Sequence, residues 1–224
     1  MNAPTWFDNP AITVELLPSL GETIAMTAWS TALAILLGLP LGVLLYVTRP
    51  RQILAMPVLN QALGIITNVG RSIPFIILMV AIIPFTRMLV GTSIGINAAS
   101  VPLTIAAIPF VARLIEGALN EISPGLIESA QSMGATPWQI ITKVLIPEAR
   151  GGIITGLTIT VVTLVSYSAM AGAVGGGGLG DLGIRYGYNR FNPTIMLITV
   201  VILVVMVQGF QSLGDYLVRK SDRK

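Results

Sequence analysis

The stretch Ile127–Ala149, IESAQSMGATPWQIITKVLIPEA, interrupts a chain that is otherwise strongly apolar. Charged and helix-breaking residues recur along it, including Glu128, Gly134 and Lys143, and long apolar runs lie on both sides. Backbone turns and charged side chains are costly inside lipid. We therefore expect this segment to lie in water, between two segments that cross a membrane.

The composition of the whole chain supports a membrane protein. Its 224 residues are 54% hydrophobic and 10% charged, with a mean hydropathy of +0.82, whereas soluble domains carry about 25% charged residues. The sequence has no cysteine and no histidine, which excludes disulfides, thiol nucleophiles, a Ser-His-Asp triad and the usual zinc sites. The basic residues do not gather on one soluble face, so lipid is expected as a partner and nucleic acid is not.

Five membrane spans are predicted, each near the roughly 20 residues that a bilayer core requires. They cover residues 21–47, 61–85, 96–118, 151–174 and 193–213. Arg49 and Arg51 end the first span, and Arg71 lies within the second. The fold class is therefore an all-α integral membrane protein that crosses the cytoplasmic membrane several times.

The distribution of Lys and Arg predicts the orientation. One side of the five-span arrangement carries nine basic residues: Arg49, Arg51, Arg113, Lys143, Arg150, Arg219, Lys220, Arg223 and Lys224. The other side carries three: Arg87, Arg185 and Arg190. We expect the N-terminus outside and the C-terminus in the cytoplasm, with residues 1–19 extracytoplasmic and 215–224 a basic cytoplasmic tail. Residues 1–19 lack Lys and Arg, and therefore the basic region with which a signal peptide begins, so they are not predicted to be a signal peptide.

Small residues at four-residue spacing occur in two of the spans. Gly38 and Gly42 form one such pair, and Gly151 or Gly152 forms another with Thr155 or Gly156. Pairs of this kind let helix backbones approach closely in membranes. They are also common in ordinary membrane helices, so they predict packing rather than a specific function.

The polar segment reads as a helix–glycine–helix hairpin over residues 121–149. Ser123 and Pro124 are typical of a helix start, Gly134 of its end, and Thr136-Pro137 of a second start. We expect Pro147 to close the second helix. The predicted apolar faces are Leu126, Ile127, Ala130 and Met133 on the first helix, and Trp138, Ile141, Val144 and Leu145 on the second.

The same segment carries a sequence motif whose residues stand at defined intervals. ESAQSMG (128–134) is followed by nine residues and then VLIP (144–147). It resembles the EAA motif of ABC importer permeases; Ser129, Val144 and Ile146 are mild departures. In that family the loop holds a coupling helix that inserts into a cleft of a separate ATPase. The resemblance implies a coupling role for Glu128, Ser129, Ala130, Met133, Gly134 and Pro147. An interfacial hairpin without a partner is the alternative.

Further stretches are similar to the methionine branch of these permeases. They are VTRP (47–50), RSIPFIIL (71–78), IPFTRMLVGTSIG (83–95), MGATPWQI (133–140) and YSAMAGAVGGGGLGDLGIRYGY (167–188). The resemblance implies a type I ABC importer fold over residues 20–214 and a cargo of L- and D-methionine. It also implies a second copy of the chain, two ATPase subunits that use ATP, and an extracytoplasmic methionine-binding lipoprotein. The chain itself would bind no cofactor or metal and would not be an enzyme.

The run AGAVGGGGLGDLG (171–183) is not a phosphate-binding loop, because no Lys-Ser/Thr follows Gly175, Gly176, Gly177 and Gly178. It is either a plain packed turn or, by the resemblance, part of an extracytoplasmic gate. Arg71, Tyr167 and Met170 are candidates for the translocation path. Each has a structural alternative, in which Arg71 bonds carbonyls at a kink or reaches the interface and the others pack in the core.

Rival functions stay open at this point. A permease of the same type could carry another amino acid or an osmoprotectant. An ATP-independent carrier would usually show an internal inverted repeat, and none is visible. An intramembrane enzyme would need paired ionisable groups at the midplane, where only Arg71 is evident. A purely structural membrane subunit would not need the hairpin signature.

Overall fold

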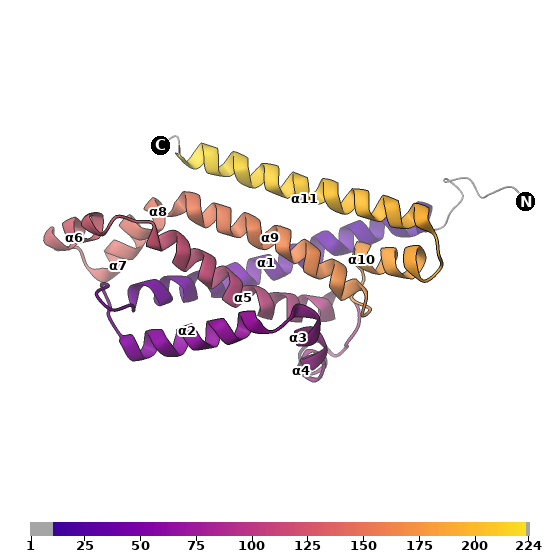
Figure 1. The fold of residues 1–224 in the computed structure, drawn as a ribbon, viewed down its shortest axis with the longest axis horizontal. Coiled ribbons are helices and arrows are strands. Elements are labelled where there is room, and N and C mark those ends of the chain that lie inside the picture. The colour runs from indigo at the N-terminus through magenta and orange to yellow at the C-terminus, as the bar shows by residue number, and fades with distance from the viewer. Residues whose placement is uncertain (1–10, 223–224) are drawn as a thin grey trace, which may run out of the picture. The chain divides into compact units, whose positions relative to one another are not determined.

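The computed structural model describes residues 11–222, which form helices and connecting turns without any β-strand (Figure 1). The elements are the π-turn Ala11–Glu15 (η2), α1 Leu16–Val47, α2 Pro57–Ser72, α3 Phe75–Ala81, α4 Ile83–Val90, α5 Ile96–Asn120, α6 Pro124–Ser132, α7 Pro137–Ile140, the π-turn Ile141–Leu145 (η3), α8 Ile146–Glu148, α9 Arg150–Gly172, α10 Gly178–Leu182, the π-turn Gly183–Tyr188 (η4) and α11 Pro193–Asp222. The first ten residues of the expected extracytoplasmic segment, and the last two of the basic tail, lie outside the described residues.

Four helical stretches are long and apolar enough to cross a membrane. They are Ala11–Val47, Ile96–Asn120, Arg150–Gly172 and Pro193–Ser221. The all-helical fold and four of the predicted spans are thereby confirmed. Two helices extend beyond the prediction, because α1 already begins at Leu16 and α11 continues to Asp222.

The remaining predicted span, 61–85, is not one continuous helix. Helix α2 ends at Ser72, Ile73 adopts an extended conformation (φ −83°, ψ 122°), and α3 begins after Pro74. A proline ring disfavours the helical conformation of the preceding residue, so Ile73 leaves the helix. The predicted span is therefore broken at Pro74, and α2 and α3 together satisfy the criteria for a broken span, which brings the possible total to the predicted five.

The chain divides into two compact units, and the long helices contribute to both. Unit 1 contains the chain up to Ala32 together with Pro74–Ile105 and Val161–Phe210. Its fully buried cluster consists of Ala11, Leu179, Leu182 and Ile195. Unit 2 contains Leu33–Ile73, Ala106–Thr160 and the chain from Gln211 onwards.

Unit 2 is built around the second half of α5, which small residues approach closely. A Cβ added at Gly38 would lie 2.8 Å from the Val111 Cβ, and one at Gly42 would lie 2.7 Å from the Ile115 Cβ. On α9, a Cβ added at Gly152 would lie 2.8 Å from the Ala118 Cβ. These contacts confirm the packing role predicted for the small residues of α1 and α9. Helix α5 leads directly from this packed region into the polar hairpin.

Candidate functional site

The first helix of the hairpin, α6, begins at Pro124 as predicted. Ile127 and Ala130 are buried, whereas Glu128 and Ser129 are exposed. The Ser129 hydroxyl donates to the Gly125 carbonyl at 2.7 Å, within the helix. Packing therefore fixes one face of α6 and leaves the carboxylate of Glu128 free to meet another molecule.

Gly134 turns the chain between α6 and α7. Its φ is +79°, a conformation that costs a residue with a Cβ extra energy. The Gly134 N–H donates to the Gln131 carbonyl at 2.9 Å. Thr136 then caps α7: the Gln139 N–H donates to the Thr136 hydroxyl, and the Thr136 N–H donates to the Gln139 side chain at 2.9 Å. This reciprocal capping box makes the turn a locally determined structure.

The predicted apolar faces of the hairpin are partly wrong. Trp138 is 72% exposed and Met133 is 81% exposed, whereas Ile140 and Leu145 are almost completely buried. The π-turn Ile141–Leu145 places more residues in each turn than an α-helix does, which changes which of the residues after it face inward. Before this turn, the hairpin presents three large apolar side chains on its surface: Leu126, Met133 and Trp138.

The expectation that Pro147 closes the second helix is also wrong. Pro147 lies in the first turn of α8, directly after the π-turn, and the chain bends only at Ala149 before α9 begins at Arg150. The Ile146 N–H donates to the Ile141 carbonyl, five residues back. The wider turn lets helical structure pass through a residue that has no N–H.

These features give the hairpin a surface suited to docking. Glu128, Met133, Gly134 and Trp138 are exposed on short helices whose inner faces are packed. Amphipathic helices with exposed apolar anchors are a recurrent way of filling a groove in a partner protein.

The four glycines belong to a turn that is held by α1. Gly175, Gly177 and Gly178 have positive φ values. The Gly178 N–H donates to the Glu22 carboxylate at 2.7 Å, and the Leu179 N–H donates to the Thr23 hydroxyl at 2.8 Å. Sequence analysis missed Glu22 and Thr23; the only signal was an acidic residue at the start of an apolar helix.

A second polar cluster in unit 1 joins the start of the described chain to η4. Glu15 accepts from Arg185 at 2.6 Å and from the Tyr186 hydroxyl. The hydrogen bond with Glu15, together with loss of surrounding water, raises the pKa of Tyr186 above its ordinary value of 10.0. Arg190 lies over the Tyr186 ring at 4.3 Å. The cluster orders the connection that precedes α11.

The structure places the candidate path residues in different settings. Tyr167 on α9 stacks on Phe75 of α3, with ring centroids 4.5 Å apart, and Met170 is 47% exposed. Arg71 is exposed in the last turn of α2, and its guanidinium group makes no hydrogen bond or ion pair within residues 11–222. Unit 1 thus brings together Tyr167, Met170 and the glycine turn, and Arg71 belongs to unit 2.

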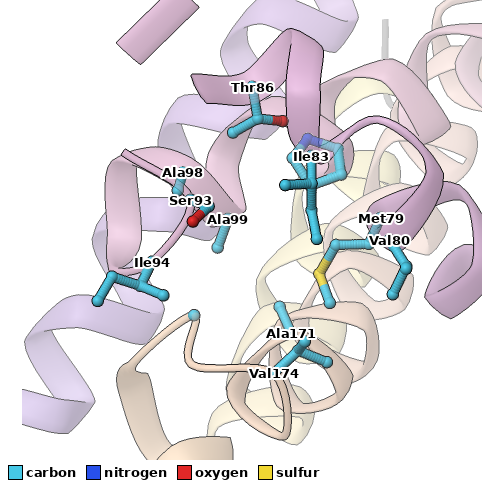
Figure 2. Close-up of a pocket in the computed structure, with 12 residues that line it drawn as sticks. Met79, Val80, Ile83, Thr86, Ser93, Ile94, Ala98, Ala99, Ala171 and Val174 are labelled. Carbon is cyan, nitrogen blue, oxygen red and sulfur yellow. The ribbon is translucent and has the colours of Figure 1, made fainter. Parts of the chain in front are cut away.

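A small cavity of about 130 Å³ lies within unit 1, between α3, α4, the start of α5 and the end of α9 (Figure 2). Its walls are mostly apolar, with Met79, Ile83 and Val174 among them. The Thr86 hydroxyl oxygen on its wall is buried and has no hydrogen-bond partner among the described residues. The end of α9 next to the glycine turn therefore borders a space that packing leaves unfilled.

The largest omission of the sequence analysis is Glu116. This residue near the end of α5 is 4% exposed and ion-paired to both Arg49 and Arg113. The i,i+3 spacing of Arg113 and Glu116 was a visible signal for one of these pairs.

Between residues 11 and 222 there is no group of three or more metal-binding side chains.

Comparison with known proteins identifies a matching family and several similar proteins. Residues 34–223 match the family model described as the binding-protein-dependent transport system inner membrane component. A relative from Vibrio cholerae, named probable D-methionine transport system permease protein MetI, is 60% identical over 209 residues, which is 93% of each chain. The Escherichia coli K12 protein named D-methionine transport system permease protein MetI is 57% identical over 70% of this chain and 72% of its own.

Solved structures agree with these relatives. A structure titled as an inward facing conformation of the MetNI methionine ABC transporter covers 99% of both chains, with a TM-score of 0.91 and 52% identity. An amino acid ABC transporter crystallised with histidines has a TM-score of 0.75 at 21% identity and covers 91% of this chain. The second similarity concerns the fold alone.

Proposed function

Because the chain belongs to the family of binding-protein-dependent transport system inner membrane components, we propose that it is the permease subunit of an ATP-driven importer of L- and D-methionine. The observation that carries this proposal is the hairpin, which exposes Glu128, Met133 and Trp138 on a packed, capped scaffold. The 60% identical relative named as a D-methionine permease supports the cargo.

The proposed assembly contains two copies of this chain, two ATPase subunits and an extracytoplasmic methionine-binding lipoprotein. ATP is bound and hydrolysed by the partner subunit, and this chain contributes neither a cofactor site nor a catalytic group. The excess of Lys and Arg on the side of the hairpin supports a cytoplasmic hairpin and C-terminus, with the N-terminus outside. In this orientation the hairpin faces the compartment that supplies ATP.

In the proposed mechanism, closure of the ATPase dimer displaces the hairpin, which transmits the movement to the spans. Gly134 and the Thr136 cap favour this role because they define the turn without help from distant residues. We assign Tyr167, Met170 and the turn Gly175–Gly178 to the translocation path or its gate. Arg71, exposed at the end of α2, is a further candidate for the path.

The test is co-purification with the genomically neighbouring ATPase, followed by methionine uptake in vesicles that contain the lipoprotein. Glu128→Arg combined with Met133→Asp changes two exposed side chains without entering the packed face. We expect this variant to insert normally but to lose the ATPase. Asp215→Asn on exposed α11 serves as the charge control and should retain it. Retention of the ATPase by the double variant would contradict the proposal.

The cargo is tested separately, because the binding protein takes part in selecting it. Uptake of labelled L- and D-methionine is compared with uptake of another amino acid and of an osmoprotectant, in vesicles with the same lipoprotein. ATP-dependent uptake confined to methionine is the expected result. Uptake without ATP would instead favour a carrier.

A further inference from the structure

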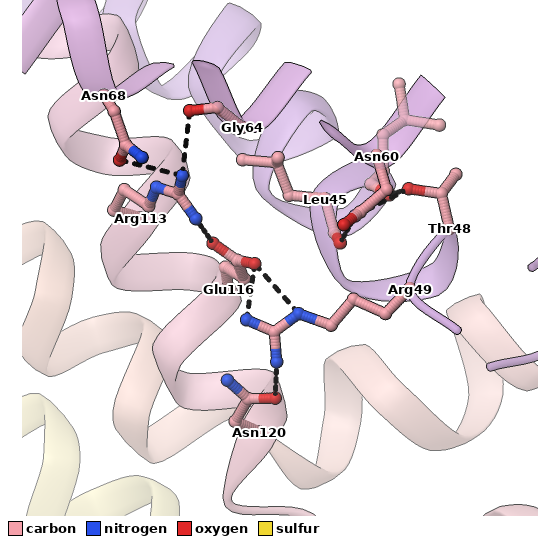
Figure 3. Close-up of polar contacts among 10 residues, drawn as sticks. Leu45, Thr48, Arg49, Asn60, Gly64, Asn68, Arg113, Glu116 and Asn120 are labelled. Carbon is pink, nitrogen blue, oxygen red and sulfur yellow. Dashed lines mark hydrogen bonds and ion pairs between the residues drawn. The ribbon is translucent and has the colours of Figure 1, made fainter. Parts of the chain in front are cut away.

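A polar network around a buried carboxylate joins three helical segments of unit 2 (Figure 3). Glu116 lies one turn before the end of α5, and its side chain is 5% exposed. The Arg49 Nε, just after α1, donates to its Oε1 at 3.0 Å, and the Arg113 Nη1 donates to its Oε2 at 2.6 Å. Both carboxylate oxygens are therefore engaged, each by a different guanidinium.

The two arginines extend this network to further elements. The Arg113 Nη2 donates to the Gly64 carbonyl at 3.0 Å and to the Asn68 side chain at 2.9 Å, both on α2. Arg49 also donates to Asn120, the last residue of α5. Glu116 thus links the end of α1 to the last turns of α5, and Arg113, itself on α5, links the same region to the middle of α2.

A network of this kind constrains geometry more than it adds stability. Taking charges out of water is costly, and the attraction between them repays that cost only if their geometry is well defined. Guanidinium–carboxylate hydrogen bonds are directional. Small-residue contacts such as Gly42 against Ile115 hold the helices close together, and the Glu116 network adds bonds that also depend on direction.

Its place in the chain suggests what it transmits. Asn120 ends α5, and the 121–149 hairpin follows at once. The hairpin is joined to α5 at one end and to α9 at the other, and the network is the polar connection from α5 to α1 and α2. We propose that Glu116, Arg113 and Arg49 form a transmission joint, a set of positioning residues that makes α1 and α2 move with the hairpin; this inference rests on the proposed function.

The first test measures methionine transported per ATP hydrolysed, in reconstituted transporter with its lipoprotein. Glu116→Gln keeps the size of the side chain but loses its charge. We expect the transport-to-ATP ratio to fall by about 2- to 30-fold, the range in which residues that carry coupling act, while the ATPase remains bound and active. The matched control Asp215→Asn removes one exposed carboxylate from the same unit and should leave the ratio unchanged.

An unchanged ratio of methionine transported to ATP hydrolysed in Glu116→Gln would contradict the proposed transmission joint. Equal losses of methionine uptake and ATP hydrolysis would contradict it as well. If that variant fails to insert, Arg49→Gln decides, because its side chain is 33% exposed and the Arg113–Glu116 pair survives. Failure of the proposed function would look different, since the unmodified chain would then show no ATP-dependent methionine uptake.

The second test follows the movement itself. The chain contains no cysteine, so labels on Val58→Cys in α2 and Ser123→Cys at the base of the hairpin, introduced into one of the two copies, report one intramolecular distance. We expect this distance to be the same with and without ATP in the otherwise unmodified chain, and to change with ATP when Arg113→Gln is added, because that substitution removes the bonds to Gly64 and Asn68 of α2. A nucleotide-dependent distance before that change, or a constant one after it, would contradict the joint.

Discussion

The hairpin turn at Gly134 and the glycine turn at 175–178 both use glycines with positive φ, but they are held in different ways. The hydrogen-bond partners of the hairpin turn are close to it in the sequence, because Gln131, Thr136 and Gln139 supply its hydrogen bonds. The glycine turn depends on Glu22 and Thr23, each 156 residues from its bonding partner. One turn is therefore specified by local sequence, and the other by the assembly of unit 1.

The space around the two turns differs as well. A Cβ added at Gly134 would have no heavy atom within 4 Å, whereas one at Gly178 would lie 2.6 Å from the Thr23 hydroxyl oxygen. Substitution at the hairpin is thus limited by the backbone dihedral alone. Substitution at the glycine turn is limited by contacts with other segments, so we expect the larger effects there.

The largest effect is expected for Gly172→Ala, where α9 ends against α10. Its Cβ would lie 2.2 Å from the Asp181 backbone nitrogen, and a backbone atom cannot rotate away as a side chain can. We expect a loss of about 3 kcal/mol or more in stability and a clearly lower melting temperature in detergent. Gly209→Ala, also in unit 1, has no neighbour within 4 Å and should melt like the unmodified chain. Equal melting of both variants would refute the proposed close contact.

Glu22→Ala should have the next largest effect, because it removes the carboxylate that accepts from the Gly178 N–H. Hydrogen bonds to charged groups contribute roughly 1.5–3 kcal/mol, so we expect a loss of about 2 kcal/mol. Glu22→Gln keeps an acceptor oxygen and should lose less. Hydrogen exchange at Gly178 and Leu179 measures the effect, and unchanged protection in Glu22→Ala would show that the turn does not need the Glu22 carboxylate.

These contrasts explain how much of the molecule could be predicted from the sequence. Four spans follow from hydropathy, and the starts at Pro124 and Pro137 follow from local capping patterns. The break at Pro74 does not follow from the proline alone, because prolines are also tolerated within continuous membrane helices. Partners that are distant in sequence could not be predicted: no residue near Glu22 indicates its bond to Gly178, and no residue near Glu116 indicates its pairing with Arg49.

In the hairpin, Gly134→Ala tests whether the dihedral alone matters. We expect a loss of about 1–2 kcal/mol, since a Cβ in the left-handed region is strained even in open space. Gly134→Asn should lose less, because asparagine tolerates this conformation. The measurement is the opening free energy of α6 and α7 from hydrogen exchange. A larger loss for Asn than for Ala would mean that side-chain size, and hence a contact, governs this position.

The smallest effect separates two helix starts that look alike in the sequence. Thr136 caps α7 through its side chain, whereas Ser123 stands at the same position before α6 without a side-chain hydrogen bond. Thr136→Ala should therefore weaken protection of α7 by about 1 kcal/mol, and Ser123→Ala should leave α6 nearly unchanged. Hydrogen exchange of the two helices provides the comparison within one hairpin. If the two substitutions cost the same, the reciprocal bond between Thr136 and Gln139 does not define the turn, and the hairpin depends on its buried face at Ile127, Ala130 and Ile140 instead.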